Sequence, residues 1–372
     1  MQFNSIIGQQ EIIQHLLKMA KSSRISHAQL FLGNAGFGGL PLALAFSQFL
    51  LCENPSESDS CGACPSCKKC EINQHPDLHF SFPTVLSIAD KSNLVLPQWR
   101  EMIANSPYFD LNQWTLEMDE KGRKPVIGTV ESQEIMKKLA LKSFEGGYKI
   151  MIIWMAEEMN ATCANKLLKI LEEPPEKTLF LLVCENAEHL LPTIISRTQL
   201  IKLAAISDED LAQALTTKHA VSPELTKSII ALCSGDYVEA KRLIQQGNVS
   251  SFNEDKFIEC MRISYKKEVN SMLNWAEDLS AVGRENQKVF LKYSLHMFRQ
   301  SILMNYTGDQ LTQLSETEAS FLKNFARFIT GNNVTELMNS FSDAHYQVER
   351  NANSKILFTD LCFKVMRLIH LA

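Results

Sequence analysis

Apolar residues along this chain form two recurring patterns. Continuous apolar runs are typical of buried parallel strands and occupy residues 30–32, 150–155, 179–183 and 200–203. Apolar residues three or four positions apart are typical of helices and occur within the first thirty residues and at 42–51, 126–144, 160–171 and 192–195. Because predicted strands and helices alternate, the pattern indicates an α/β fold with a doubly wound parallel sheet over residues 1–203.

Local signals set some of the helix ends. Thr129 is the expected N-cap of the helix in 126–144, and the prolines at 174–175 end the helix before them. The irregular segment 80–125 is interpreted as a connection with one short helix, in which Trp99, Met102 and Ile103 pack into the core.

The remainder of the chain reads as helical. Residues 204–247 form a small helical segment that begins after Ser207, and helical spacing then continues to the end. Amphipathic stretches lie near 290–303, 321–329 and 356–371. With 372 residues the chain is longer than one typical domain, and we expect three domains, at 1–203, 204–247 and 248–372.

Charge and hydropathy limit the classes of partner. Lys and Arg total 37 against 42 Asp and Glu, a formal charge of −5, so contact with nucleic acid requires a local basic patch. The sequence shows neither a charged leader before an apolar stretch nor an apolar run near the ~20 residues that span a bilayer. We expect a cytoplasmic protein without a membrane partner.

Half of the ten cysteines lie in residues 52–70, a distribution that favours metal binding over disulfides. The predicted zinc ligands share the spacing C-x8-C-x2-C-x2-C and are Cys52, Cys61, Cys64 and Cys67. Gly62 and Pro65 favour the tight turns that this spacing needs. Four protein ligands predict a structural zinc ion, although Cys70, His75 or His79 remain alternatives for one position.

A glycine-rich loop follows the first predicted strand and precedes a helix. Gly33, Gly36 and Gly38 provide the frame of a phosphate-binding P-loop. The lysine and the hydroxyl residue of an active P-loop are replaced by Gly39 and Leu40, which supply neither charge nor a Mg²⁺ ligand. An ordinary tight turn between strand and helix is the alternative interpretation.

Three sequence features together resemble a known family. They are the cysteine cluster, the His-Pro-Asp sequence at 75–77, and the stretch LLKILEEPPEKTLFLLVCENAEHLLPTIISRTQLIKL. The chain resembles bacterial clamp-loader subunits, which are AAA+ proteins of the DNA polymerase III holoenzyme, over most of residues 1–203. This resemblance implies an AAA+ P-loop-type parallel sheet with an inserted zinc module at 52–70, a small helical lid and an all-α collar that holds subunits in a ring.

Departures from the family pattern indicate which kind of subunit this is. Trp154 and Met155 stand where motor subunits carry the Asp-Glu pair, and Val238 stands at the nucleotide-sensing arginine. The resemblance therefore implies a non-hydrolysing delta-prime subunit, for which ATP binding and hydrolysis are not expected.

The same resemblance assigns a role to Arg197. In the sequence Ser-Arg-Thr it matches the family's arginine finger, which reaches the ATP of a neighbouring subunit, and Thr198 replaces the usual cysteine. The implied partners are gamma/tau ATPase subunits and the delta subunit, with the sliding clamp and primer-template DNA reached through the complex.

Two rival functions remain open at this point. One is an ATP-hydrolysing gamma/tau-like motor subunit, and the other is a zinc-dependent nucleic-acid-binding module, for which Lys68 and Lys69 are the basic residues near the cysteines. The sequence leaves open whether the glycine loop still holds a nucleotide and what the 80–125 segment does.

Overall fold

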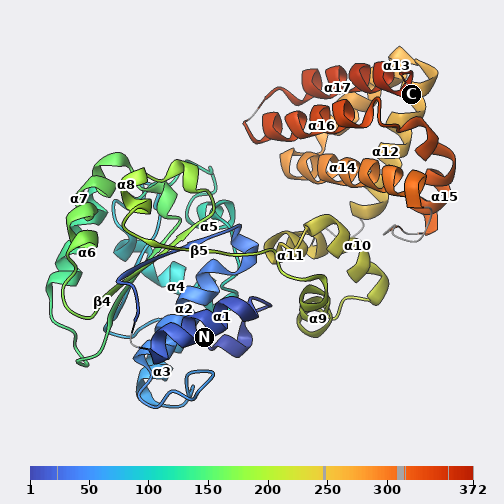
Figure 1. The fold of residues 1–372 in the computed structure, drawn as a ribbon. Helices are drawn as coiled ribbons and strands as arrows, with labels where there is room; N and C mark the ends of the chain where they lie inside the picture. The colour runs from blue at the N-terminus through green and yellow to red at the C-terminus, as the bar shows by residue number, and fades with distance from the viewer. Residues whose placement is uncertain (23, 246–248, 308–313, 315, 351, 372) are drawn as a thin grey trace. The chain divides into compact units, whose positions relative to one another are not determined.

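A parallel β-sheet forms the centre of the N-terminal part of the chain (Figure 1). Its strands are β1 (Ala28–Leu32), β2 (Leu78–Ser81), β3 (Lys149–Trp154), β4 (Thr178–Cys184) and β5 (Gln199–Lys202). The order across the sheet is β2-β3-β4-β1-β5, and every described pairing is parallel. The predicted parallel α/β sheet is confirmed, but the apolar runs revealed four of its strands and missed β2.

The computed structural model describes residues 1–372 except 23, 246–248, 308–313, 315, 351 and 372. Its contacts separate two units, Met1–Ala214 with Gly235–Glu239 and Leu215–Ser234 with Ala240–Ala372. The division into domains at 1–203, 204–247 and 248–372 stays a prediction, and its second boundary lies outside the described residues.

Alternation along the strands divides the core of the first unit in two. Phe31 and Trp154 face one layer, whereas Leu30 and Ile153 face the other, because successive side chains point to opposite faces of a sheet. The first face is covered by α1 (Gln10–Lys21), α2 (Gly39–Leu51), α4 (Leu96–Asn105) and α5 (Leu111–Met118). The second is covered by α6 (Thr129–Ala140), α7 (Ala161–Glu172) and α8 (Pro192–Ile195).

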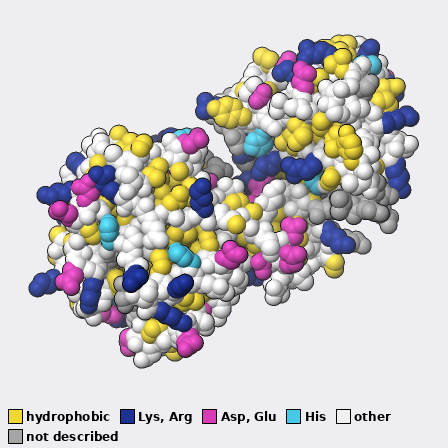
Figure 2. All heavy atoms as spheres, in the orientation of Figure 1, with side chains coloured by type: hydrophobic (Ala, Val, Ile, Leu, Met, Phe, Trp, Pro, Cys, Tyr) yellow, Lys and Arg dark blue, Asp and Glu magenta, His cyan; other side chains and the backbone are white. Residues whose placement is uncertain are grey.

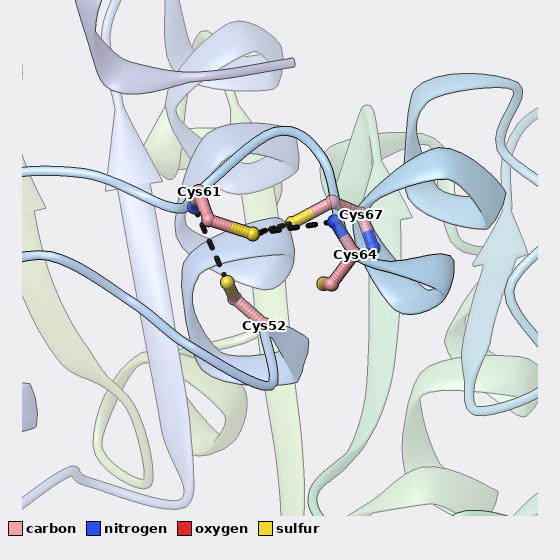
Figure 3. Close-up of side chains that lie close together, drawn as sticks. All are labelled: Cys52, Cys61, Cys64 and Cys67. Atoms are coloured by element: carbon pink, nitrogen blue, oxygen red, sulfur yellow. Dashed lines mark hydrogen bonds between the residues drawn. The ribbon is translucent and has the colours of Figure 1, made fainter.

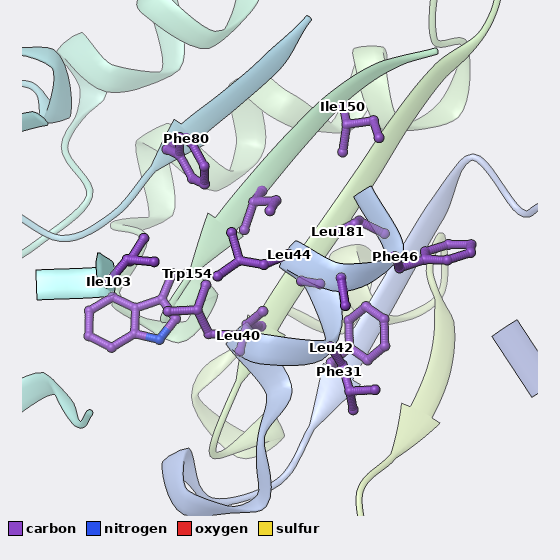
Figure 4. Close-up of a cluster of buried hydrophobic side chains, with 14 of the residues drawn as sticks. Phe31, Leu40, Leu42, Leu44, Phe46, Phe80, Ile103, Ile150, Trp154 and Leu181 are labelled. Carbon is purple, nitrogen blue, oxygen red and sulfur yellow. The ribbon is translucent and has the colours of Figure 1, made fainter. Parts of the chain in front are cut away.

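The segment 80–125 is more ordered than the sequence suggested. It holds both α4 and α5, so the expectation of a single short helix is wrong. Asp110 begins α5 with a capping box to Gln113, which stabilises a helix too short to show a clear period. Trp99 and Ile103 are buried as predicted, and Figure 4 shows Ile103 beside Trp154 in this core.

Helix ends depend on local hydrogen bonds. Asn160 begins α7, where its side chain accepts a hydrogen bond from the Cys163 N–H at 2.8 Å. Gly128, not Thr129, is the N-cap of α6 and makes no side-chain capping bond, so that sequence prediction is wrong. Thr129 is instead the first residue of the helix.

The second part of the chain is helical in its described residues, as expected. Its helices, together with those of the predicted lid, are α9 (Asp208–His219), α10 (Pro223–Cys233), α11 (Tyr237–Gln245), α12 (Val249–Lys266), α13 (Val269–Ala281), α14 (Arg284–Thr307), α15 (Glu316–Phe325), α16 (Val334–Glu349) and α17 (Ser354–Ile369). A second core of aromatic and aliphatic residues lies among α12 to α17. No helix in the described parts of the chain has the length and apolar character needed to cross a membrane.

Candidate functional site

The four predicted zinc ligands come together in space (Figure 3). Their sulfur atoms all lie within 4.8 Å of one another, and the sulfurs of Cys61 and Cys67 are 3.9 Å apart. Tetrahedral zinc with Zn–S bonds of about 2.3 Å requires sulfur atoms roughly 3.8 Å apart. The spacing of these thiols is therefore compatible with one zinc ion.

Local backbone structure brings these cysteines together. Cys52 follows the last residue of α2, and Gly62 adopts a positive φ of 67° in the loop that follows. Cys64 is the N-cap of α3 (Pro65–Glu71), where its sulfur accepts a hydrogen bond from the Cys67 N–H at 3.4 Å. The bend at Gly62 and the start of α3 thus bring the four thiols close together.

The protonation of these thiols follows from their surroundings. Hydrogen bonds from the N–H groups of Ala63 and Cys64 lower the pKa of Cys61 to about 6, which favours the thiolate that zinc requires. Burial raises the pKa of Cys52 and of Cys67, so a bound cation would be needed to hold these two as thiolates. Four thiolates leave zinc no open position for a substrate, which makes a structural role the fitting one.

The alternative ligands lie outside this cluster. Cys70, His75 and His79 are absent from the only metal-compatible group among the described residues. His75 is buried and bonded through Nε2 to Glu145 Oε2 at 2.9 Å, while its Nδ1 accepts the Asp77 N–H. The His-Pro-Asp sequence therefore fixes the loop before β3 to the start of β2.

Hydrogen bonds also connect the loop that carries the cysteines to the N-terminal residues. The carboxylate of Asp59 accepts hydrogen bonds from the N–H groups of Phe3 and Asn4, both at 3.0 Å. Gln2 donates to the Ser60 carbonyl at 2.6 Å. A metal that orders this loop would thereby order the first residues of the chain as well.

The charges near the cysteines offer little to nucleic acid. Lys68 pairs with Glu71 at 3.3 Å and Lys69 with Glu145 at 2.6 Å. Figure 2 shows Asp and Glu side chains among the Lys and Arg side chains on the visible face of the first unit. The two lysines on which the nucleic-acid alternative depended are thus neutralised by neighbouring glutamates.

The glycine loop joins β1 to α2 as predicted, but side chains of the chain itself lie against it. A Cβ on Gly36 would lie 1.8 Å from Asp236 Oδ1, and one on Gly38 would lie 3.3 Å from the Tyr108 hydroxyl. A Cβ on Gly33 would meet the Leu203 side chain at 2.8 Å. Close packing requires glycine at positions 33 and 36, and Gly38 has a positive φ of 91° that other residues rarely adopt, whether or not a phosphate binds.

Tyr108 anchors this packing. It is buried, its hydroxyl accepts the Ile7 N–H at 2.9 Å, and its ring meets that of Tyr237 edge to face at 5.0 Å. The loop is therefore held by residues from three distant parts of the sequence, the N-terminal segment, the α4–α5 connection and the start of α11.

Carboxylates surround the same loop. Glu185 follows β4, and burial, followed by the nearby Glu157, raises its pKa to about 8; Asp110 and Asp236 add to the effect, while the Ala35 N–H opposes it. Burial also raises the pKa of Glu157, whose Oε1 accepts the Glu185 N–H at 2.6 Å. Both shifts favour the neutral carboxylic acid, and neither group supplies the positive charge that holds the phosphates of a nucleotide.

The end of β3 is apolar, where motor subunits of the resembled family carry acids. Trp154 is buried, with its ring 4.9 Å from Trp99 and 5.1 Å from Phe109. Met155 is buried as well and adopts a left-handed backbone conformation, with φ of 52°. Neither side chain can coordinate Mg²⁺ or polarise a water molecule.

Arg197 lies in the turn between α8 and β5, with its side chain 31% exposed. Its Nε donates to Glu172 Oε1 at 2.6 Å, its Nη2 donates to the same oxygen, and its Nη1 donates to the Thr193 carbonyl at 2.9 Å. The guanidinium is thus held at the surface by the last residue of α7 and by the Thr193 carbonyl.

Sequence reasoning found the glycines, the cysteines and Arg197, but not their neighbours. Tyr108 lies in a segment that carries no motif. Asp236 stands two residues before Val238, at the position compared with the family's nucleotide-sensing arginine, yet the sequence did not indicate that it lies against the glycine loop. Glu172 stands in the recognised LEEPP stretch, yet its contact with Arg197, 25 residues later in the chain, depends on the fold.

Comparisons with known proteins find relatives among the subunits of DNA polymerase III. Residues 8–207 match the model of the family described as DNA polymerase III, delta subunit. The chain is 25% identical to DNA polymerase III subunit delta' of Bacillus subtilis, over 95% of this chain and 94% of that protein. It is 32% identical to subunit delta' of Pseudomonas aeruginosa, over 60% of this chain and 57% of that protein.

A further relative is subunit tau/gamma of Haemophilus influenzae, which is 29% identical over 57% of this chain and 25% of its own length. The similarity to the B. subtilis delta' subunit, in contrast, runs through nearly the whole of both chains. The chain therefore belongs to the delta-prime subunit family of the bacterial DNA polymerase III clamp loader.

Proposed function

We propose that this chain is a non-hydrolysing AAA+ subunit of the clamp loader, and that it acts on ATP bound by a neighbouring subunit through Arg197. It assembles with gamma/tau-like ATPase subunits and a delta-like subunit, and the complex loads the sliding clamp on primed DNA. The lid and the helical collar of residues 204–372 serve this assembly.

The observation that carries the proposal is a contrast in where charge is available. Arg197 is a partly exposed guanidinium next to β5, whereas the glycine loop of the same unit faces Asp236 and the buried ring of Tyr108. A permanently charged planar guanidinium can stabilise charge that builds up on a phosphate, whereas the loop, with Gly39 and Leu40 in place of the lysine and the hydroxyl residue, offers no such side chain.

The contact with Glu172 suits an arginine that must move. Glu172 is about half exposed, and ion pairs of this kind contribute about 0–1 kcal/mol in water. Release of Arg197 toward a phosphate therefore costs little, while the pair restricts the guanidinium before assembly. We expect Glu172→Ala to change the neighbour's rate by less than about fivefold.

In this proposal the zinc ion is structural. Cys52, Cys61, Cys64 and Cys67 would hold it, and when bound it would supply four Zn–S bonds that close the loop after α2. Hydrogen bonds from Phe3 to Asp59 and from Gln2 to the Ser60 carbonyl connect this loop to the N-terminal residues, so metal binding would order both. No catalytic step involves the metal.

The test is a reconstituted loader that contains Arg197→Ala. Clamp- and DNA-stimulated ATP hydrolysis at the affected site should fall by on the order of 10³, as for other arginine fingers, while gel filtration shows an intact complex. Arg123→Ala is the matched control because it removes another ion-paired surface arginine of the same unit, and it should leave the rate unchanged.

Two results would contradict the proposal. Full hydrolysis by an assembled Arg197→Ala complex would make Arg197 a purely structural residue. ATP turnover that follows the isolated wild-type chain through purification would favour the motor-subunit alternative. Gly39→Lys should create no turnover, because Leu40, Trp154 and Met155 still replace the hydroxyl and the acidic pair.

A further inference from the structure

An open groove of about 680 Å³ lies in the second unit, and it shares no residue with the sites described above. One wall is a stripe of α12 with positions one turn apart, Ile258, Met261, Arg262 and Tyr265. The other wall comes from α15 and the 3₁₀ turn that follows it at 326–328. The volume is in the range typical of ligand-binding sites, about 300–1,000 Å³.

The floor of this groove is formed by packed aromatic rings. Phe257 of α12 meets Phe321 and Phe325 of α15 edge to face, each with 6.2 Å between ring centroids. Phe321 and Phe325 are themselves stacked at 5.1 Å. Rings held in this way lose little freedom when a ligand covers them, so the floor is organised before binding.

One wall carries an exposed aromatic ring. Tyr265 is 50% exposed, and its ring lies 5.0 Å from that of Phe328 and stacks on His370 at 5.6 Å. Neighbouring rings on two sides fix its orientation. A half-exposed tyrosine in a fixed orientation is a common anchor in protein interfaces.

Charge in the groove is of one sign. Arg262 and Arg327 line it, no acidic residue does, and neither arginine has an ion-pair partner among the described residues. Arg327 stacks over the Phe328 ring at 4.9 Å. Thr317 at the edge of the groove donates a hydrogen bond to the carboxylate of Glu254 at 3.2 Å, and burial raises the pKa of that glutamate.

The polar residues of α15 follow one edge of the groove. Thr317, Ser320 and Asn324 are three and four positions apart, so they lie on one side of the helix beside the phenylalanine rings. Hydroxyl and amide groups in a row can bond the backbone of an extended or helical peptide. The groove thus combines an apolar floor, a hydrogen-bonding edge and two cations.

We propose that this groove binds an acidic peptide segment of a partner protein that inserts one large apolar side chain. The apolar side chain would cover Phe321 and Phe325, and carboxylates beside it would pair with Arg262 and Arg327, which hold carboxylates in bidentate geometry. Such a segment is complementary in charge to the groove, although the whole chain carries a net charge of −5.

The charges favour a peptide over single-stranded nucleic acid. A nucleic-acid strand presents a phosphate at every nucleotide and is held by a basic groove that follows several of them. Here the two arginines are the only cations lining the groove in the described residues, and no lysine lines it. Two cations at the edge of an aromatic pocket match a short acidic motif with an apolar anchor instead.

The test measures fluorescence anisotropy with the full chain and a panel of labelled peptides. Each peptide places one Phe, Trp or Leu among Asp and Glu residues, and matched peptides replace the apolar residue by Ala or the acids by Lys. We expect micromolar binding for an acidic peptide with an apolar residue, at least tenfold weaker binding after replacement by Ala, and none for the Lys peptides. Oligo-dT is included as the nucleic-acid probe.

Variants assign the binding to the groove. Arg262→Glu and Arg327→Glu should each weaken binding at least tenfold, whereas Arg299→Glu, at an exposed position of α14 outside the groove, should not. Circular dichroism checks that each variant is folded. Asn324→Trp provides a second test, because it keeps both charges but adds bulk at an exposed edge position and should also weaken binding.

Three outcomes would overturn the proposal. The first is no binding by any acidic peptide of the panel at up to about 1 mM, the weakest range of specific recognition. The second is equal binding by the wild type, Arg262→Glu and Asn324→Trp. The third is binding of oligo-dT, lost in Arg262→Glu, without peptide binding, which would make the groove a nucleic-acid site.

Discussion

The glycine loop and the turn that holds Arg197 lie in the same unit but differ in chemistry. At the loop, the half-buried side chain of Asp236 packs against Gly36 and the buried ring of Tyr108 packs against Gly38, and further carboxylates lie nearby. At the turn, a cation is held near the surface by a partly exposed glutamate and by the Thr193 carbonyl. Side chains of the same unit pack closely against the loop, whereas the guanidinium at the turn stays partly exposed. In the proposed function, the chain's own side chains pack against one half of an ATP site, while the other half acts on a neighbouring subunit.

The largest expected effect comes from Arg197→Lys, which tests whether the turn acts through geometry or through charge alone. Lysine keeps the positive charge but lacks the planar fork, so most of the roughly 10³-fold loss expected for Arg197→Ala should persist. The measurement is clamp-stimulated ATP hydrolysis of the reconstituted complex. Full rescue by lysine would show that any nearby cation suffices.

Removal of a zinc ligand tests whether a change elsewhere in the same unit lowers ATP hydrolysis by the complex as much as substitution of Arg197 does. Altering residues that only support ligands costs about 10–100-fold in metal affinity, so Cys61→Ser should cost more than about 100-fold. Elemental analysis and competition with a chelator measure this loss. Cys70→Ala is the matched control, since Cys70 lies in the same module outside the cluster, and it should retain zinc.

The complex with Cys61→Ser should keep most of its ATP hydrolysis, because Arg197 is untouched. If its rate fell as far as that of Arg197→Lys, the special role given to the turn would be lost. Absence of zinc from carefully prepared wild-type protein would instead show that the four thiols serve another purpose.

Gly36→Ala tests whether the glycine loop belongs to the core. The added methyl group would meet Asp236, so we expect a loss of about 1–3 kcal/mol in the free energy of unfolding, measured by urea denaturation. Gly147→Ala is the control, because nothing lies within 4 Å of its added Cβ, and it should stay within about 0.5 kcal/mol of the wild type. Equal stability of the two variants would mean that the loop can accommodate a methyl group at position 36 without loss of packing.

The last prediction concerns the pH dependence of stability near the loop. Glu185 has a pKa of about 8 in the folded chain against 4.5 for an ordinary glutamate, so the folded state binds more protons between these pH values. Its contribution to stability is therefore complete below pH 4.5 and is lost as the pH rises through 8.

Glu185→Gln should remove this dependence. Relative to the wild type, the variant should gain stability between pH 5 and pH 8.5, as measured by urea denaturation at both pH values. Glu188→Gln changes an exposed glutamate of the same segment and serves as the control. If the stability of both variants changed equally between pH 5 and pH 8.5, the surroundings of Glu185 would not raise its pKa.

The sequence by itself determined the elements whose signals are local or strongly patterned. Continuous apolar runs gave β1, β3 and β4 because strands buried on both faces favour apolar residues at every position. The run at 200–203 gave β5 as well, although Ile201 is the one buried residue of that edge strand. Cysteine spacing gave the metal-compatible cluster because turns of two residues hold neighbouring thiols together. The short strand β2 and the helix α5 were missed, since neither is long enough to show a clear period.

Only the tertiary structure decided what surrounds those signals. Tyr108 and Asp236 reach the glycine loop, and Glu172 reaches Arg197, across separations that no local pattern records. The groove between α12 and α15 arises in the same way, from two helical stripes whose facing is set by packing around Phe257. Periodicity reports which side of an element is apolar, but which other element covers it depends on the free energy of the whole packed core.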